Sequence, residues 1–391
     1  MSDIQAPADL IPVNIITGFL GSGKTTLLNH WVNTPEFKDT LVLINEFGDV
    51  GLDHELVQAV DDTVVLLGSG CICCTLQGEL VDALATNFVK AQRGDMPAFK
   101  RVLIETTGLA DPAGVIATLG GDEYLIDHFR YNGTVTILDA QHVREQLKTQ
   151  YEAVKQIALA DIILISKTDL VDAAEIEAIS EAARRINHSA PIHPVLNGRI
   201  SPAIMNEIGP YNENEHHNMD MVKSWLSFND KSLASPLRPV QVNESESIGL
   251  AKPKIIAHSN IESFSMVLTE PLEPLALLAA ISLVQQQYGD SILRIKGILD
   301  LKGQDKPVII HGVQGSLYPL TELDEWPDNE KVSKLVFIVR SAVKDQIEHI
   351  FKSALEDPDE ASLSYYQQII DEASLSGSSD DPAEDSTENK Q

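Results

Sequence analysis

Short apolar runs alternate with longer amphipathic stretches from about residue 11 to about residue 200. The short runs are rich in Val, Ile and Leu, which predicts buried strands, and the stretches between them have helical spacing. Strands separated by helices in this way indicate a parallel α/β sheet with right-handed crossovers, flanked by helices. The predicted strands are 12–17, 41–45, 63–67, 101–105, 134–139 and 161–166, and predicted helices include 24–32, 77–91 and 173–186.

The alternation fades between residues 205 and 255, where polar residues and prolines predict a loop-rich linker with one helix at 221–228. This places a first domain at 1–204 and a second at 256–355. The second domain is predicted to be a smaller α+β unit, with an antiparallel or mixed sheet and helices on one face. Its predicted strands are 261–268, 292–301, 308–312 and 334–340, and its predicted helices are 272–288 and 343–355.

Residues 356–391 form an acidic tail, and we expect disorder at least after residue 374. The segment there is rich in Ser, Asp and Glu, and it cannot bury enough apolar surface to offset the entropy of ordering. The whole chain is also acidic, with 58 Asp and Glu against 29 Lys and Arg and a net charge of −29. Nucleic acids and anionic membranes both need a basic surface, so neither is an expected partner.

The three cysteines, Cys71, Cys73 and Cys74, lie within four consecutive positions. An odd cluster of this kind fits a reducing compartment and metal or redox chemistry, not a disulfide framework. No apolar run reaches the roughly 18 residues of a membrane span, and the first ten residues lack the segments of a secretory leader. We therefore expect a cytoplasmic protein.

A glycine-rich segment, Gly18-Phe19-Leu20-Gly21-Ser22-Gly23-Lys24-Thr25, follows the first predicted strand and opens a helix. This is the pattern and the context of a phosphate-binding loop. Its glycines let successive backbone N–H groups point at phosphate oxygens, and the helix N-terminus also favours an anion. We expect Lys24 to bridge the β- and γ-phosphates and the Thr25 hydroxyl to reach Mg²⁺.

Base choice is predicted by Ser166-Lys167-Thr168-Asp169, which follows a buried strand. The Asp169 carboxylate can accept hydrogen bonds from N1–H and the exocyclic amine of guanine, a donor pair that adenine lacks. The Lys167 stem can cover one face of the base. This predicts GTP as the nucleotide, although Ser166 stands where Asn is commoner.

The strand 101–105 ends on Glu105, and Gly108 follows three residues later. We expect the Glu105 carboxylate to hold Mg²⁺ through water and the Gly108 N–H to reach the γ-phosphate. The sequence offers no catalytic glutamine or arginine in an evident position. Hydrolysis by this chain alone is therefore predicted to be slow, because positioning groups supply much of the rate of phosphoryl transfer.

The cysteine cluster follows a buried strand and the turn Gly68-Ser69-Gly70, which lets several sulfurs converge. Thiolates select Zn²⁺, Co²⁺ or Cu⁺, and three thiolates leave one position of a tetrahedral zinc site open. Glu46, Asp49, a histidine or a client ligand can fill that position. Two alternatives stay open, namely reduced cysteines without metal and a redox-sensing role.

Taken together, these segments resemble the CobW-like P-loop GTPases, which act as metallochaperones for zinc or cobalt. The resemblance rests on 18–26, Asn45-Glu46-Phe47-Gly48, 70–74, 105–112 and 166–169, and on Leu293-Arg294-Ile295-Lys296-Gly297 and 308–312 in the second block. It covers roughly residues 11–355. It implies that Cys71, Cys73 and Cys74 are metal ligands and that Glu46 lies beside them in the switch region.

The resemblance implies a GTPase that binds Zn²⁺ or Co²⁺ and delivers it to a client metalloprotein through its C-terminal domain, as a monomer or an oligomer. The implied cofactors are GTP, Mg²⁺ and Zn²⁺. The alternatives are a signalling or assembly GTPase with a purely structural zinc and a small-molecule kinase. The predicted nucleotide-binding residues are Gly18, Gly21, Ser22, Gly23, Lys24, Thr25, Thr26, Lys167 and Asp169, and the predicted catalytic residues are Lys24, Thr25, Glu105 and Gly108.

Overall fold

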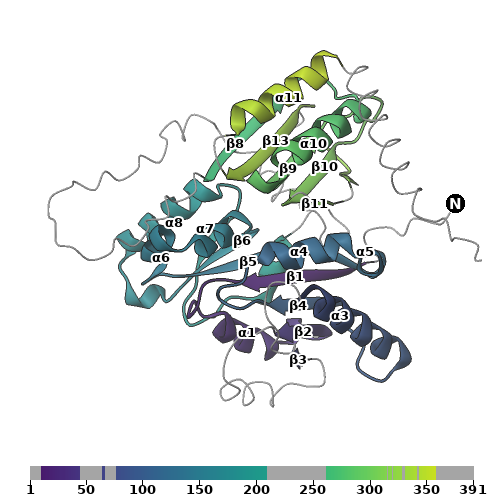
Figure 1. Cartoon of the computed structure of the whole chain (residues 1–391). Helices are drawn as coiled ribbons and strands as arrows, with labels where there is room; N and C mark the ends of the chain where they lie inside the picture. Colours follow the sequence, from purple (N-terminus) through teal and green to yellow (C-terminus); the bar gives the residue numbers. More distant parts are fainter. Residues whose placement is uncertain are drawn as a thin grey trace, which may run out of the picture.

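The computed structural model of the chain describes residues 10–44, 64–66, 76–208, 261–314, 316–318, 320–327, 331–340 and 343–357. The linker and the acidic tail predicted from the sequence lie mostly outside these residues. The described residues contain two separate β-sheets, one in the lower and one in the upper part of the molecule in Figure 1. No helix in this part of the chain is both long enough and apolar enough to cross a membrane.

The first sheet has seven strands in the order β3-β2-β4-β1-β5-β6-β7, and every neighbouring pair is parallel. This confirms the predicted P-loop type of α/β fold. The strands are β1 (Ile11–Thr17), β2 (Thr40–Ile44), β3 (Val64–Leu66), β4 (Arg101–Glu105), β5 (Phe129–Asp139), β6 (Ile162–Ser166) and β7 (Ile192–Pro194).

Helices cover both faces of this sheet, so even β2 and β6, each next to an edge strand, are buried along their whole length. They are α1 (Lys24–Val32), α3 (Leu76–Arg93), α4 (Pro112–Gly121), α5 (Glu123–His128), α6 (Val143–Thr149), α7 (Tyr151–Ala158) and α8 (Ala173–Ile186). Asp111, Asp122 and Asp172 begin α4, α5 and α8, and each side chain accepts a backbone N–H of the first turn.

The second sheet is antiparallel, in the order β11-β10-β9-β13-β8, with β12 paired to β10. The predicted smaller α+β domain is thus observed, and its sheet is antiparallel and not mixed. Its strands are β8 (Ile261–Leu268), β9 (Ile292–Leu299), β10 (Val308–Val313), β11 (Ser316–Leu317), β12 (Thr321–Glu322) and β13 (Ser333–Arg340), and its helices are α10 (Pro274–Tyr288) and α11 (Lys344–Glu356).

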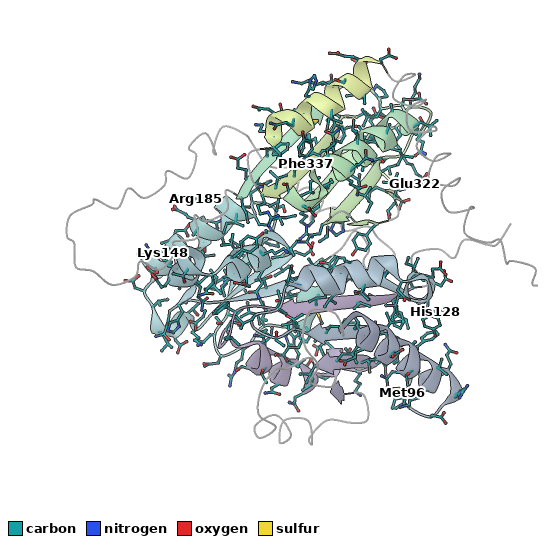
Figure 2. The ribbon with its side chains drawn as sticks, viewed as in Figure 1. Met96, His128, Lys148, Arg185, Glu322 and Phe337 are labelled. Carbon is teal, nitrogen blue, oxygen red and sulfur yellow. The ribbon has the colours of Figure 1, made fainter. Side chains whose placement is uncertain are left out.

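Alternation along the strands divides the second sheet between two cores. Phe337 on β13 packs with α10 and α11, whereas its neighbour Ile338 belongs to the core of the first domain. Figure 2 shows Phe337 among the side chains inside the C-terminal domain, while Lys148 and Arg185 lie at the surface of the first domain. The second sheet therefore covers its helices with one face and the first domain with the other.

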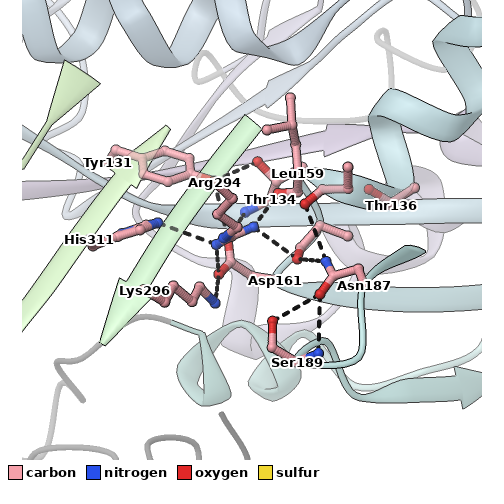
Figure 3. A network of polar contacts seen from close by, with 12 residues as sticks. Tyr131, Thr134, Thr136, Leu159, Asp161, Asn187, Ser189, Arg294, Lys296 and His311 are labelled. Carbon is pink, nitrogen blue, oxygen red and sulfur yellow. Dashed lines mark hydrogen bonds and ion pairs between the residues drawn. The ribbon is translucent and has the colours of Figure 1, made fainter. Parts of the chain in front are cut away.

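A buried group of charges joins the two domains at the amino end of β6. We call Asp161, Arg294 and Lys296 the interdomain cluster (Figure 3). The Asp161 carboxylate pairs with the Arg294 guanidinium and accepts from Lys296 Nζ at 2.8 Å, and all three side chains are at most 2% exposed. It also accepts from Thr134 N at 3.0 Å and from the Tyr131 hydroxyl at 3.1 Å.

Burial and the neighbouring opposite charge shift the pKa values of Asp161 and Lys296 in opposite directions. Burial alone raises the pKa of Asp161, but Arg294 and Lys296 hold that pKa well below its usual range. Burial and the neighbouring Arg294 lower the pKa of Lys296 to about 7, against the favourable effect of Asp161. Arg294 Nη1 also donates to the carbonyl oxygens of Leu159 at 2.6 Å and Ala160 at 2.9 Å, directly after α7.

Candidate nucleotide and metal site

The phosphate loop connects the buried strand β1 to α1 at the carboxyl edge of the first sheet. Gly18 has a φ of 146°, and a Cβ there would lie 2.3 Å from the Ile137 carbonyl oxygen, so only glycine fits. Gly23 caps α1 at a φ of 96° and makes no side-chain capping bond. The first N–H groups of α1 therefore point toward the loop without a side-chain acceptor from the cap, which suits an anion.

The Lys24 side chain folds back across this loop. Its Nζ donates to the carbonyl oxygens of Gly18 at 2.9 Å and Phe19 at 3.3 Å, and the residue is 9% exposed. An ammonium group held in the concavity of a glycine-rich loop is placed to meet phosphate oxygens. Of the other predicted phosphate-binding residues, Ser22 is buried in the loop, Gly21 is exposed at a φ of 73°, and Thr26 is exposed on α1.

The two residues predicted to hold Mg²⁺ come together although they are far apart in the sequence. Thr25 Oγ1 on α1 donates to Glu105 Oε1 at the end of β4, at 3.2 Å, and Glu105 is 5% exposed. A hydroxyl and a carboxylate are oxygen donors of the kind that Mg²⁺ prefers. The donor set therefore fits a Mg²⁺ ion beside the phosphate loop.

The loop after β4 lies directly against the phosphate loop. Thr106 N donates to the Ile16 carbonyl oxygen at 3.0 Å, and a Cβ on Gly108 would lie 2.6 Å from Leu20 N. This close approach requires glycine at position 108. Among the described residues, the buried hydroxyl of Thr107 finds no hydrogen-bond partner, which leaves a polar atom in this loop available to a ligand.

We call Ser166-Lys167-Thr168-Asp169, which is predicted to recognise the base, the base-recognition loop. Ser166 ties this loop to the phosphate loop. Its hydroxyl lies 2.6 Å from the Ser22 carbonyl oxygen and 3.1 Å from that of Leu138, so one short side chain connects three segments. Asn is commoner at this position, and here serine reaches the phosphate loop by itself. Sequence reasoning treated this residue as a weak match and missed the contact.

The side chains of Lys167 and Asp169 have different surroundings, one paired and one exposed. Lys167 has a φ of 55°, and its Nζ pairs with Asp139 Oδ2 at 2.7 Å. Burial tends to raise the pKa of Asp139, but bonds from Lys167, His142 and the Gln141 N–H hold the pKa below its ordinary value. Asp169 lies on the short 3-10 helix Thr168–Leu170 and is exposed, which is compatible with its predicted contact to a base.

A turn after β7 also belongs to this site and was not predicted. Thr168 Oγ1 donates to the Val195 carbonyl oxygen at 3.3 Å, which brings residues 195–198 beside the base-recognition loop. Asn197 and Gly198 both have positive φ, of 50° and 67°. The Asn-Gly pair was the available signal, because it is a strong turn former.

The predicted metal ligands Cys71, Cys73, Cys74 and Glu46, together with Asp49, lie outside the described residues. The described part contains no group of three or more side chains suited to a metal. It does show where the two segments that contain the predicted metal ligands leave the sheet. Ile44, at the end of β2, pairs with Leu66 on one side and with Glu105 on the other, so both segments leave beside the predicted Mg²⁺ ligand.

Comparisons with known proteins agree with this geometry. Residues 12–194 match the CobW/HypB/UreG nucleotide-binding domain, and residues 261–355 match the C-terminal domain of the cobalamin synthesis protein cobW. The zinc chaperone YjiA of Escherichia coli is 31% identical over 345 residues, which cover 87% of this chain and 98% of YjiA. The chain belongs to the CobW family.

Other members of the CobW family carry related names. The zinc chaperone CobW of Sinorhizobium is 25% identical over 348 residues, covering 80% of this chain and 88% of that protein. The zinc-regulated GTPase metalloprotein activator 1 of Schizosaccharomyces pombe is 33% identical over 205 residues, covering 51% of this chain and 49% of that protein.

Two solved structures share the fold over most of the chain. The Zn(II)-bound YjiA GTPase from E. coli has a TM-score of 0.61 at 27% identity, covering 88% of this chain and 99% of that one. A Zn(II)-bound YjiA triple mutant, with one glutamate and two cysteines changed to alanine, has a TM-score of 0.62 at 26% identity and the same coverage. Both domains of this family member are thus represented among known structures.

Proposed function

We propose that this chain is a GTP-hydrolysing metallochaperone that binds Zn²⁺ or Co²⁺ through Cys71, Cys73, Cys74 and Glu46 and delivers it to a client metalloprotein. The observation that carries the proposal is the alignment of Ile44, Leu66 and Glu105 at one edge of the sheet. The nucleotide site and the two segments with the metal ligands therefore start from the same place. The similarity to zinc chaperones over nearly the full length of YjiA supports the same function.

In this proposal the described residues have different roles in binding the nucleotide. The backbone from Gly18 to Thr26 and the Lys24 ammonium bind the phosphates, and Thr25 and Glu105 hold Mg²⁺, which neutralises charge on the phosphates when bound. Gly108 offers its N–H to the γ-phosphate. Asp169 accepts from guanine, and the Lys167 stem covers the base. Intrinsic hydrolysis is slow in this proposal, because no arginine or glutamine is assigned to the attacking water.

The nucleotide controls the cargo through the loops at this edge. Contacts to the γ-phosphate order the segment after Ile44 and the one after Leu66, the thiolates converge, and the metal binds tightly. Hydrolysis removes those contacts and releases the metal to a client docked on the C-terminal domain. Coupling of this kind is reciprocal, so GTP must tighten metal binding by the same factor by which metal tightens GTP binding.

The decisive experiment compares metal affinity in the two nucleotide states. Zn²⁺ affinity is measured by competition with a chelator in the Mg²⁺ complexes of GDP and of a non-hydrolysable GTP analogue, and we expect tighter binding in the latter. Zinc content alone is an insufficient readout, because the YjiA variant that lacks one glutamate and two cysteines is still Zn(II)-bound. Co²⁺ titration adds the needed specificity, since thiolate ligation produces intense near-ultraviolet absorption.

Two variants separate this function from its alternative. Cys73→Ala is expected to remain folded and to bind GTP while it loses the thiolate absorption and the delivery of metal. Loss of folding or of nucleotide binding in Cys73→Ala would favour a structural zinc in a signalling or assembly GTPase. Lys24→Met is the matched control, since it keeps every cysteine and should lose only the nucleotide dependence of metal binding.

The base specificity has a separate test in Asp169→Asn. The carboxamide replaces one acceptor by a donor, so it opposes the guanine N–H groups and suits the additional carbonyl of xanthine. We expect a preference for xanthosine over guanosine nucleotides, measured by competition with a fluorescent nucleotide. An unchanged preference for guanine would remove Asp169 from the site.

A further inference from the structure

Gln156 holds the turn that carries Gly108. The turn closes through a hydrogen bond from Ala110 N to the Thr107 carbonyl oxygen at 3.1 Å. Gln156 Nε2 donates to the carbonyl oxygens of Gly108 at 3.3 Å and Ala110 at 3.2 Å. Both amide hydrogens of Gln156 are thus used on the loop that is proposed to meet the γ-phosphate.

The position of Gln156 in α7 makes this contact informative. Gln156 is 1% exposed and lies on a helix that otherwise buries Ala153, Val154, Ile157 and Ala158. An apolar side chain would fill such a position without the cost of desolvating an amide. The glutamine is therefore suited to the two carbonyl oxygens of the turn and not to the packing of the helix.

Contacts from β5 and from the C-terminal domain anchor the helix that carries Gln156. Thr136 Oγ1 on β5 donates to the Gln156 carbonyl oxygen at 2.8 Å. Directly after α7, Arg294 from the C-terminal domain donates to the carbonyl oxygens of Leu159 at 2.6 Å and Ala160 at 2.9 Å. Figure 3 shows Arg294 beside Leu159. These contacts fix the position of α7 and therefore of Gln156, and the C-terminal domain contributes to them through Arg294.

We propose that Gln156 is a positioning residue that holds the Gly108 turn against Leu20 of the phosphate loop and so confers the preference for GTP over GDP. The inference rests on the proposed GTPase function. The turn can stabilise only a ligand that reaches it. The γ-phosphate, which is proposed to reach it, is present in GTP and absent from GDP. Ordering the turn before binding removes an entropic cost that would otherwise oppose GTP alone.

The test is Gln156→Met, which keeps the length of the side chain and removes both donors. We expect affinity for a non-hydrolysable GTP analogue to fall about tenfold, which corresponds to the loss of one to two hydrogen bonds. Affinity for GDP should stay within about twofold, because the phosphate loop, Lys24 and Asp169 are unchanged. Amide hydrogen exchange of the peptide covering 106–111 should rise in the same variant.

Asn187→Leu is the matched control. Asn187 Nδ2 also donates to carbonyl oxygens at the end of α7, those of Ile157 at 2.9 Å and Ala160 at 2.8 Å, but it does not bind the Gly108 turn. This variant should lower stability and leave the ratio of GTP to GDP affinity unchanged. The inference is overturned if Gln156→Met leaves that ratio unchanged, or if Asn187→Leu changes it equally. Failure of the wild-type chain to bind either guanine nucleotide would overturn the proposed function, and this inference with it.

Discussion

Two lysine–aspartate pairs lie at opposite ends of the neighbouring strands β5 and β6, and their surroundings differ. At the carboxyl end, Lys167 and Asp139 are 2.7 Å apart, with side chains 34% and 3% exposed. At the amino end, Lys296 and Asp161 are 2.8 Å apart, with side chains 1% and 2% exposed. The first pair supports the loop that is predicted to bind the base, and the second joins two domains.

The difference shows how the same chemical pair can serve either adaptability or docking. In the first pair water competes for the partly exposed lysine, and the buried Asp139 carboxylate keeps its contacts with the Gln141 N–H and His142 when the lysine is lost, so the pair itself adds little net stability. A fully buried group with two cations and one carboxylate is costly to disturb, because removing one partner leaves an uncompensated charge. We therefore expect changes at the amino end to alter stability and changes at the carboxyl end to alter nucleotide binding.

The largest effect is expected for Asp161→Asn. Two buried cations, Arg294 and Lys296, would lose their only carboxylate within the interdomain cluster, which should lower the free energy of unfolding by about 3–5 kcal/mol. Urea denaturation of the whole chain measures this change. Asp139→Asn is the matched control, and an equal loss of stability in the two variants would refute the contrast between the two ends.

The second effect concerns nucleotide binding at the carboxyl end. Lys167→Met should weaken both GDP and GTP about tenfold, because the variant loses the pair with Asp139 that holds the base-recognition loop and the ammonium end of the stem. The free energy of unfolding should change by less than about 1 kcal/mol. Fluorescent-nucleotide titration and denaturation report the two quantities separately. If Lys167→Met lowers the free energy of unfolding by several kcal/mol while nucleotide affinity stays unchanged, the assignment of roles is wrong.

The third effect is a pH dependence specific to the amino end. The pKa of Lys296 is lowered to about 7 in the folded state, while the unfolded chain keeps the ordinary value of 10.5. Between these two values the unfolded state binds more protons, so stability should rise with pH, by at most about 1.4 kcal/mol per pH unit. Denaturation at pH 7, 8 and 9 tests this, and Lys296→Met should abolish that rise.

The smallest effect is expected for Ser166→Ala. The change removes one hydroxyl that bonds to the Ser22 and Leu138 carbonyl oxygens, which should cost about 1 kcal/mol, or roughly fivefold in guanine nucleotide affinity. Ser180→Ala removes a comparable buried hydroxyl, which bonds to the Ile176 carbonyl oxygen at 2.8 Å within α8 and has no bond to the loop. Equal nucleotide affinity of the two variants would show that serine does not connect the loops functionally.

The regular elements of the fold were predictable because their patterns are local. The helices at 24–32 and 173–186 and the strands at 101–105 and 261–268 have the predicted bounds. The strand β7 and the two-residue strands β11 and β12 were missed, because such short segments have no measurable periodicity. The phosphate loop, Glu105 and Lys167 were predicted as site residues from motifs that combine a fixed spacing with a strand or helix context.

Contacts between distant segments could not be predicted. Arg294 meets Asp161 across 133 positions, and Gln156 meets Gly108 across 48, so neither pair has a local signal. Leu293-Arg294-Ile295-Lys296-Gly297 was noticed only as part of a resemblance, and the structure gives it a physical role between the domains. The roles of Cys71, Cys73, Cys74 and Glu46 remain predictions, because these residues lie outside the described part.

Strands β2, β3 and β4 end at the same level of the sheet. The number of residues after each strand therefore limits how far Glu46 and Cys71 can lie from that edge. Glu46 is two positions after Ile44 and Cys71 is five positions after Leu66, and an extended chain advances at most about 3.6 Å per position. Glu46 is thus within about 7 Å of its strand end and Cys71 within about 18 Å. In the proposed function these short tethers keep a bound ion close to the phosphate loop until it is released, so that metal loading and GTP hydrolysis would take place in one neighbourhood of the molecule.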